Sequence, residues 1–211
     1  MSKKTNIPRS PGRPKTGADQ ASVQTNILMT ASRLFMEYGY EPVSLQQIAS
    51  LCNVTKASIY YHFTSKADLF TVAITRIMMM SMQQTSLRLD EPGTLQERLI
   101  KVAQAKMQHS HIETESMMRE AEKHLNTEQL SQIREAEVQI FEVLAAHFQQ
   151  EMDNGYLRVA SPMLLAHAFT SLLMLANRED VRNMNGGSIE ELARELVALF
   201  LDGAVRRSEN I

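Results

Sequence analysis

The amino-acid sequence predicts an all-α protein. Apolar residues recur every three or four positions in nine successive segments, the period expected of a helix with one buried face. Capping residues, glycines and prolines separate these segments, and none of them shows the alternation of a half-buried strand. The chain has 211 residues, of which 44% are hydrophobic, so it is long enough for a sizeable core in one or two domains.

The N-terminal part begins with a polar tail, followed by a first helix. Residues 1–20 hold three of the six prolines and lack an apolar period, so we expect a disordered tail. A helix is predicted over residues 21–38, with Gly39 ending it. Its predicted inward stripe comprises Ile27, Leu28, Ala31, Leu34, Phe35 and Tyr38.

Two short helices separated by three residues follow in the stretch 43–66. Ser44 can cap the first of them and Thr55 the second. Ile59 and Phe63 would anchor the second helix, while its polar side chains face away from the core. A short helix that displays hydrogen-bond donors and rests on a longer one is typical of a helix-turn-helix, whose second helix can enter the major groove of DNA.

Six more helices are predicted downstream, and the boundaries between them carry clear signals. Glu91-Pro92-Gly93 breaks the chain after the first of them, Ser161-Pro162 starts another, and Gly186-Gly187 precedes the last. Their predicted ranges are 65–87, 94–109, 113–125, 127–154, 161–177 and 188–205.

Charge is unevenly distributed along the chain. Residues 1–76 hold nine Lys and Arg against four Asp and Glu, a net charge of +5, whereas residues 77–211 carry a net charge of −7. A basic front and an acidic rear favour a polyanionic partner for the front alone. The alternative is a chance clustering of solvated charges.

The stretch 43–66 also resembles the DNA-binding signature of the TetR/AcrR family of transcriptional regulators. The family pattern is a GY or GF, then T-x-x-x-I-A, a turn, S-x-x-x-[LI]-Y-x-[HY]-F, and K-x-x-L. The counterparts here are Gly39-Tyr40, Ser44 with Ile48-Ala49, Thr55 with Ile59-Tyr60-Tyr61-His62-Phe63, and Lys66 with Leu69. Asn53, Ala57 and Thr64 depart from the family pattern.

The resemblance covers residues 22–75 and implies a two-domain plan, with a three-helix helix-turn-helix domain followed by a six-helix regulatory and dimerisation domain. The expected divisions are a disordered basic arm (1–20), a DNA-binding domain (21–66), and a ligand-binding and dimerisation domain (67–211).

Ten residues are predicted to contact double-stranded DNA. The phosphate contacts expected are Ser44, Tyr61, His62 and Lys66, and the base-edge contacts are Thr55, Lys56, Ser58 and Tyr60. Arg13 and Lys15 belong to a basic arm that would enter the minor groove. Two alternatives stay open: the tyrosines would pack against the first helix, and the tail would merely be solvated.

The resemblance further implies a homodimer through the last two helices and a pocket for a small hydrophobic effector. The segment 161–177 is apolar nearly all round, which favours an interface; the alternative is that both helices merely complete a monomeric core. The candidate pocket residues are Met107, His111, Met118, Phe141 and His147. Methionine adapts to varied ligands, but at helical spacing it is more often a core residue.

No enzyme chemistry is predicted from the sequence. It contains no H-E-x-x-H, G-x-S-x-G or paired CxxC motif, and its six histidines are scattered, so we expect no catalytic residues, metal site or cofactor. Cys52, the only cysteine, lies on an apolar helix face and is interpreted as a core residue. The longest uncharged run, 159–177, is too polar for a membrane span, and no signal peptide is recognisable, so a cytoplasmic protein is expected.

The leading hypothesis is a homodimeric repressor that a small effector releases from a near-palindromic operator. An activator or a ligand-independent regulator of the same fold would carry the same sequence signals. A helical binding module that does not act on DNA is the third alternative, and the basic front of the chain argues against it.

Overall fold

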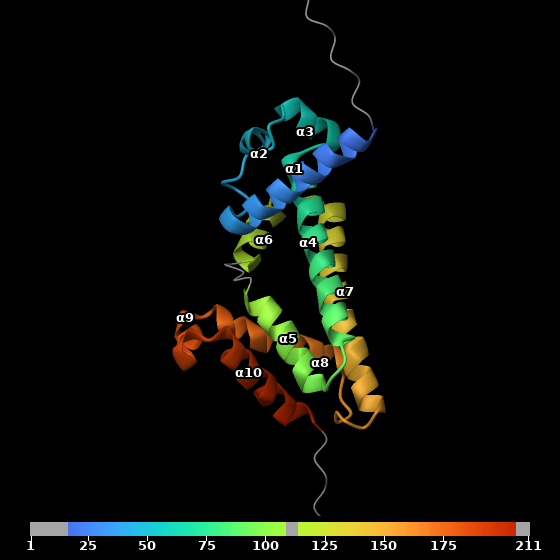
Figure 1. Ribbon diagram of the computed structural model, residues 1–211. Coiled ribbons are helices and arrows are strands. Elements are labelled where there is room, and N and C mark those ends of the chain that lie inside the picture. Colours follow the sequence, from blue (N-terminus) through green and yellow to red (C-terminus); the bar gives the residue numbers. More distant parts are fainter. Residues whose placement is uncertain (1–16, 109–113, 206–211) are drawn as a thin grey trace, which may run out of the picture.

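The computed structural model describes residues 17–108 and 114–205, and within them the chain is helical, with one isolated bridge between Leu157 and Val205. The predicted all-α fold is confirmed, as Figure 1 shows. The α-helices are α1 (Gly17–Tyr38), α2 (Leu45–Leu51), α3 (Lys56–His62), α4 (Lys66–Leu89), α5 (Leu95–Gln108), α6 (Thr114–Glu122), α7 (Thr127–Asp153), α8 (Pro162–Leu173), α9 (Glu179–Arg182) and α10 (Ile189–Ala204).

The largest differences from the sequence-based expectation lie at the first helix and around the last two. Helix α1 begins at Gly17, four residues earlier than predicted. The α-helix predicted over 161–177 ends at Leu173 and continues as the 3-10 turn η1 (Met174–Asn177). A one-turn helix, α9, and a second 3-10 turn, η2 (Met184–Gly187), fill the segment before α10, where no element was predicted.

Local hydrogen bonds set the helix starts around the helix-turn-helix. The side chains of Ser44, Thr55 and Ser65 accept from backbone N–H groups at the starts of α2, α3 and α4. Asn53 lies in the turn between α2 and α3 with φ 55°, a left-handed conformation that asparagine tolerates better than most residues. The turn that presents α3 is therefore encoded locally.

The buried side chains form two hydrophobic clusters. The N-terminal cluster combines α1, α2, α3 and the first half of α4 with Met117 and Ala121 of α6 and Ile133 of α7. The C-terminal cluster combines the end of α4 with α5, the later part of α7, α8 and α10. Helices α4 and α7 run side by side through both regions (Figure 1), so movement of either helix reaches both clusters.

Aromatic contacts hold the helix-turn-helix on α4. Phe70 of α4 meets Phe35 of α1 and Tyr40 edge to face, each at a ring distance of 5.0 Å. Tyr38 was predicted to lie on the inward stripe of α1, but it is exposed, and Tyr40 is buried beyond the helix end. The prediction for Tyr38 was wrong because Gly39 (φ 84°) ends the helix and turns the chain, which brings Tyr40 onto the core.

Polar contacts connect α5 with the end of α4 and with α7. Arg98 of α5 pairs with Glu151 of α7 at 2.6 Å and donates to the Leu89 carbonyl at 2.7 Å. Both side chains of the ion pair are mostly buried. The end of α4 therefore has a fixed position relative to α5 and α7.

Candidate nucleic-acid interface

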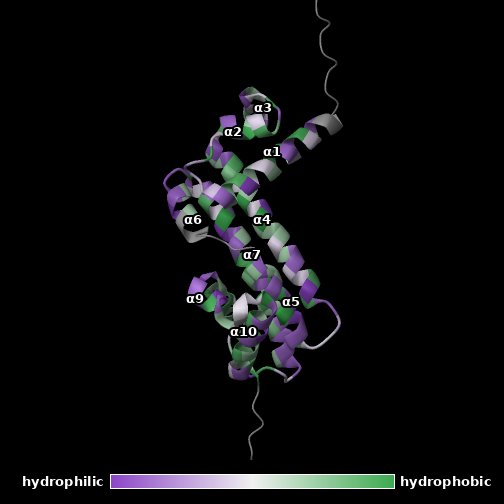
Figure 2. Cartoon of the chain, turned by 60° about the vertical axis from the view of Figure 1, so that its left-hand side comes forward, coloured by the Kyte–Doolittle hydropathy of each residue, from purple (hydrophilic) through white to green (hydrophobic). Residues whose placement is uncertain are grey.

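Helix α3 lies at the end of the molecule opposite α8 and α10 (Figure 1). Ile59 and Phe63 anchor it in the N-terminal cluster, as the sequence predicts. Its remaining side chains are exposed or half-buried, so the helix presents a mostly polar face to solvent. Figure 2 shows hydrophilic and hydrophobic residues interspersed over this end of the chain.

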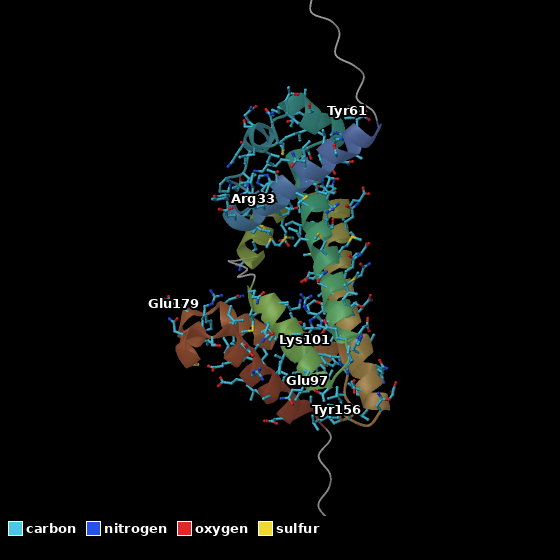
Figure 3. All side chains as sticks on the ribbon, viewed as in Figure 1. Arg33, Tyr61, Glu97, Lys101, Tyr156 and Glu179 are labelled. Carbon is cyan, nitrogen blue, oxygen red and sulfur yellow. The ribbon has the colours of Figure 1, made fainter. Side chains whose placement is uncertain are left out.

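The two tyrosines of α3 both point outward. Tyr60 is 50% exposed and Tyr61 is 71% exposed, and Figure 3 shows Tyr61 at the outer end of the molecule. Lys56 is exposed, with Nζ 5.8 Å from the Tyr60 ring. Neither tyrosine ring is buried against α1, and both are exposed to solvent.

A groove of about 340 Å³ separates α3 from the start of α1. Four of the predicted contact residues line it, namely Thr55, Ser58, Tyr61 and His62, together with Ala57 and with Gln20 and Val23 of α1. The sequence did not single out Gln20 or Val23. No local pattern shows which residues of α1 face α3, because that depends on how the helices cross.

The predicted hydroxyl contacts also serve as helix caps. Thr55 Oγ1 accepts from the Ser58 N–H at 3.1 Å and lies 3.0 Å from Ser58 Oγ. Ser44 Oγ accepts from the Gln47 N–H at 3.1 Å. Since each hydroxyl keeps its own proton, it can still donate one hydrogen bond while its position is fixed by the cap.

Lys66 has contacts inside the protein. Its Nζ donates to the Glu41 carbonyl at 3.1 Å and lies 4.3 Å from the centre of the Tyr40 ring. Burial lowers the pKa of Lys66, and the neighbouring Glu41 carboxylate partly offsets this effect. An ammonium has three donors, so the carbonyl contact leaves protons available for a phosphate.

The same loop is tied to the connection between α6 and α7. His124 Nε2 lies 2.6 Å from Glu41 Oε1, and the His124 ring stacks on Tyr40 at 5.2 Å. Residues 83 positions apart in the chain are thus joined beside Lys66. This contact connects the helix-turn-helix with the middle helices, and nothing local in the sequence predicted it.

The positive charge of the N-terminal third is concentrated outside the described residues. Residues 17–76 hold four Lys and Arg and four Asp and Glu, so the excess of +5 comes from residues 1–16. Arg13 and Lys15 lie among them, and their predicted contacts stay predictions. The net charge of +5 therefore lies on residues 1–16 alone, and residues 17–76 carry no net charge.

The candidate effector residues are distributed over two regions. Met107 is buried in the C-terminal cluster, whereas Met118 packs against the N-terminal cluster. The Phe141 ring lies 4.0 Å from that of His167, and His147 lies 3.1 Å from Asp90 Oδ1. His111 lies outside the described residues, and the role of all five in binding an effector stays a prediction.

Known proteins match both the sequence and the fold. A family model described as bacterial regulatory proteins, tetR family, matches residues 27–73. The HTH-type transcriptional repressor BepR of Brucella suis biovar 1 is 37% identical over 62 residues, which are 29% of this chain and 30% of BepR. The match thus spans less than a third of that relative's length.

Solved structures show that the likeness in fold extends over most of the chain. NemR of E. coli in its reduced form has a TM-score of 0.70 at 15% identity, covering 89% of this chain and 99% of that one. AibR in complex with isovaleryl coenzyme A and operator DNA has a TM-score of 0.59 at 23% identity, covering 84% and 97%.

The exposed α3, its capped turn and its aromatic support define a helix-turn-helix protein with a second, larger helical part. Residues 27–73 match the tetR family of bacterial regulatory proteins, and the curated proteins that align with this part of the chain are named as transcriptional repressors and regulators.

Among the described residues, no helix combines the length and apolarity that crossing a bilayer requires.

Proposed function

We propose that this protein is a sequence-specific DNA-binding transcriptional regulator whose helix α3 enters the major groove. The observation that carries the proposal is the exposed face of α3, held by Ile59 and Phe63 within the segment that the family model matches. Lys56 would meet guanine acceptors, since lysine donors pair with O6 and N7. Thr55, Ser58 and Tyr60 would meet neighbouring base edges, and Ser44, Tyr61, His62 and Lys66 would meet phosphates.

The regulator acts as a homodimer through α8 and α10. Each of these helices buries one face in the C-terminal cluster and exposes large apolar side chains on another. Leu164 of α8 is 63% exposed and Leu199 of α10 is 61% exposed. Pairing with a second copy across a two-fold axis would cover these side chains. The apolar stripe of the last helix was expected to comprise Leu192, Leu196, Leu199 and Phe200, but Leu192, Leu196 and Phe200 are buried within the chain itself.

Two copies of α3 in such a dimer would read two half-sites. Their centres would lie about 34–36 Å apart or at a multiple of that distance, because both helices must face the same side of the duplex. The operator is therefore near-palindromic.

A small effector would release the dimer from its operator in the cytoplasm and so relieve repression. The complex of AibR holds a small molecule and operator DNA together, which supports the existence of both kinds of ligand for this fold. An effector can act only if it binds the conformation that fits DNA poorly better than the one that fits DNA well.

The test is selection of bound sequences from random duplexes by the purified protein, followed by fluorescence-anisotropy titration of the enriched duplex. We expect an enriched motif with two related halves, and Lys56→Met should weaken binding by about tenfold, since a good base contact contributes ~1–3 kcal/mol of discrimination.

Lys101→Met is the matched control, because Lys101 is exposed on α5 at the other end of the molecule (Figure 3). It should bind the duplex like the parent protein. A library with no enriched motif, or equal losses in the two variants, would contradict the proposal. A reporter gene downstream of the motif then distinguishes repression from activation.

A further inference from the structure

A cavity of about 710 Å³ lies between α1, α4 and α5. Its apolar wall includes Met36 of α1, Ile77 and Met80 of α4, and Val102 and Ala105 of α5. The volume falls within the range of small-molecule sites, and so does a mainly apolar wall with a few polar groups. None of Met107, Met118, Phe141 and His147 lines this cavity, so it is distinct from the pocket predicted from the sequence.

Three cations and one carboxylate also line the cavity. Arg33 pairs with the carboxylate, Glu37, at 3.6 Å on the exposed surface of α1. Arg88 donates to the carbonyl and side-chain oxygens of Gln84, which are neutral acceptors. The lining therefore carries an excess of positive charge that its own carboxylate does not neutralise.

Lys106 is the unusual member of this set. It is half-buried on α5, and within the described part of the chain it has no hydrogen bond or ion pair. Burial lowers the pKa of its ammonium. An amino group held partly out of water without an anion is costly, and a ligand carboxylate would reduce that cost.

We propose that this cavity binds an amphipathic organic anion, with the carboxylate at Lys106 and the apolar body against Met36, Ile77 and Met80. Arg88 of α4 supplies a second cation in the lining of the cavity. Methionine side chains adapt to the shape of an alkyl chain or a ring.

Because of the position of the cavity, a ligand bound in it can affect the DNA-binding part of the chain. Its walls come from α1 of the N-terminal cluster and α5 of the C-terminal cluster, joined by α4. A bound anion therefore favours one arrangement of α1 relative to α5. Its effect on operator affinity rests on the proposed function above, while its binding does not.

The test is isothermal titration calorimetry of the full-length protein with three probes: decanoate and decyltrimethylammonium below their micelle-forming concentrations, and decan-1-ol below its solubility limit. We expect decanoate to bind one per chain and more tightly than the other two. Lys106→Met should weaken decanoate binding about tenfold or more, since contacts to charged groups are the stronger ones, and should leave decan-1-ol binding unchanged.

Lys101→Met on the same helix is the control, because Lys101 is exposed, pairs with Glu91 and does not line the cavity. A second variant, Ala105→Phe, should reduce binding of all probes by filling the space. Thermal unfolding of each variant establishes that it is folded. Equal binding of the three probes, or decanoate binding insensitive to both Lys106→Met and Ala105→Phe, would overturn the inference.

The two proposals fail separately. A protein that binds its selected duplex but takes up no decanoate overturns the anion site and leaves DNA binding in place. A protein that binds decanoate through Lys106 but enriches no duplex overturns the proposed function and leaves the anion site in place.

Discussion

Replacing Lys106 with methionine should stabilise the protein. The side chain of Lys106 is half-buried on α5, and within the described residues its ammonium has no anionic partner. Burial lowers its pKa, which means that the folded state disfavours the charged form. Methionine keeps the apolar stem against the cavity wall and removes the charge.

The size of the gain follows from the degree of burial. A fully buried ion carries an effective penalty of several kcal/mol, but Lys106 keeps part of its water, so we expect about 1–2 kcal/mol, the size of other stabilising single changes. For a chain of this length that corresponds to a rise in Tm of roughly 2–8 °C. The same change removes the proposed anion contact, so stability and binding are expected to move in opposite directions.

The sign of the pH dependence is fixed by the lowered pKa. Between that value and the unfolded value of about 10.4 the unfolded state binds more protons, so the stability of the parent protein rises with pH relative to Lys106→Met. The difference between the two proteins is fully present below the lowered pKa of Lys106 and closes above the unfolded value of about 10.4. Urea unfolding of both proteins at several pH values measures it.

Lys101→Met is again the control, because Lys101 and Glu91 form an exposed ion pair, for which we expect a change within about 1 kcal/mol in either direction. A Lys106→Met protein that is less stable than the parent by ~1 kcal/mol or more would refute the reasoning, since it would show that the ammonium has a stabilising partner.

Three further outcomes concern DNA binding and assembly. The first outcome concerns the five basic residues of the arm, namely Lys3, Lys4, Arg9, Arg13 and Lys15. Their replacement with alanine should lower the slope of log affinity against log salt concentration by up to ~4–5, because residues 17–76 have no excess of positive charge. An unchanged slope would exclude the arm from the interface. Lys66→Ala should weaken binding to all duplexes and lower the slope by about one, and a full slope in an anisotropy titration would remove Lys66 from the phosphate contacts. Leu199→Lys should shift a dimer to a monomer in analytical ultracentrifugation. Leu87→Lys on α4 is the control and should leave the dimer intact, because Leu87 is as exposed as Leu199, at 61%. Equal effects of the two changes would exclude α10 from the interface.

The sequence alone predicted the parts of the DNA-binding unit that depend on near neighbours. The caps at Ser44 and Thr55 join residues three positions apart, and the buried pair Ile59 and Phe63 follows from helical spacing. Asn53 adopts the left-handed conformation that its place in the turn requires. Such features are readable because their hydrogen bonds and steric limits act within about one helical turn.

Only the tertiary structure brought distant residues together. The contact of His124 with Glu41 joins positions 83 apart, and the cavity beside Lys106 draws its walls from three helices. Periodicity shows that a residue faces inward, but it does not show which helix it meets or whether side chains fill the space between them. The helix-turn-helix was therefore predictable, whereas the candidate anion site depended on how α1, α4 and α5 pack.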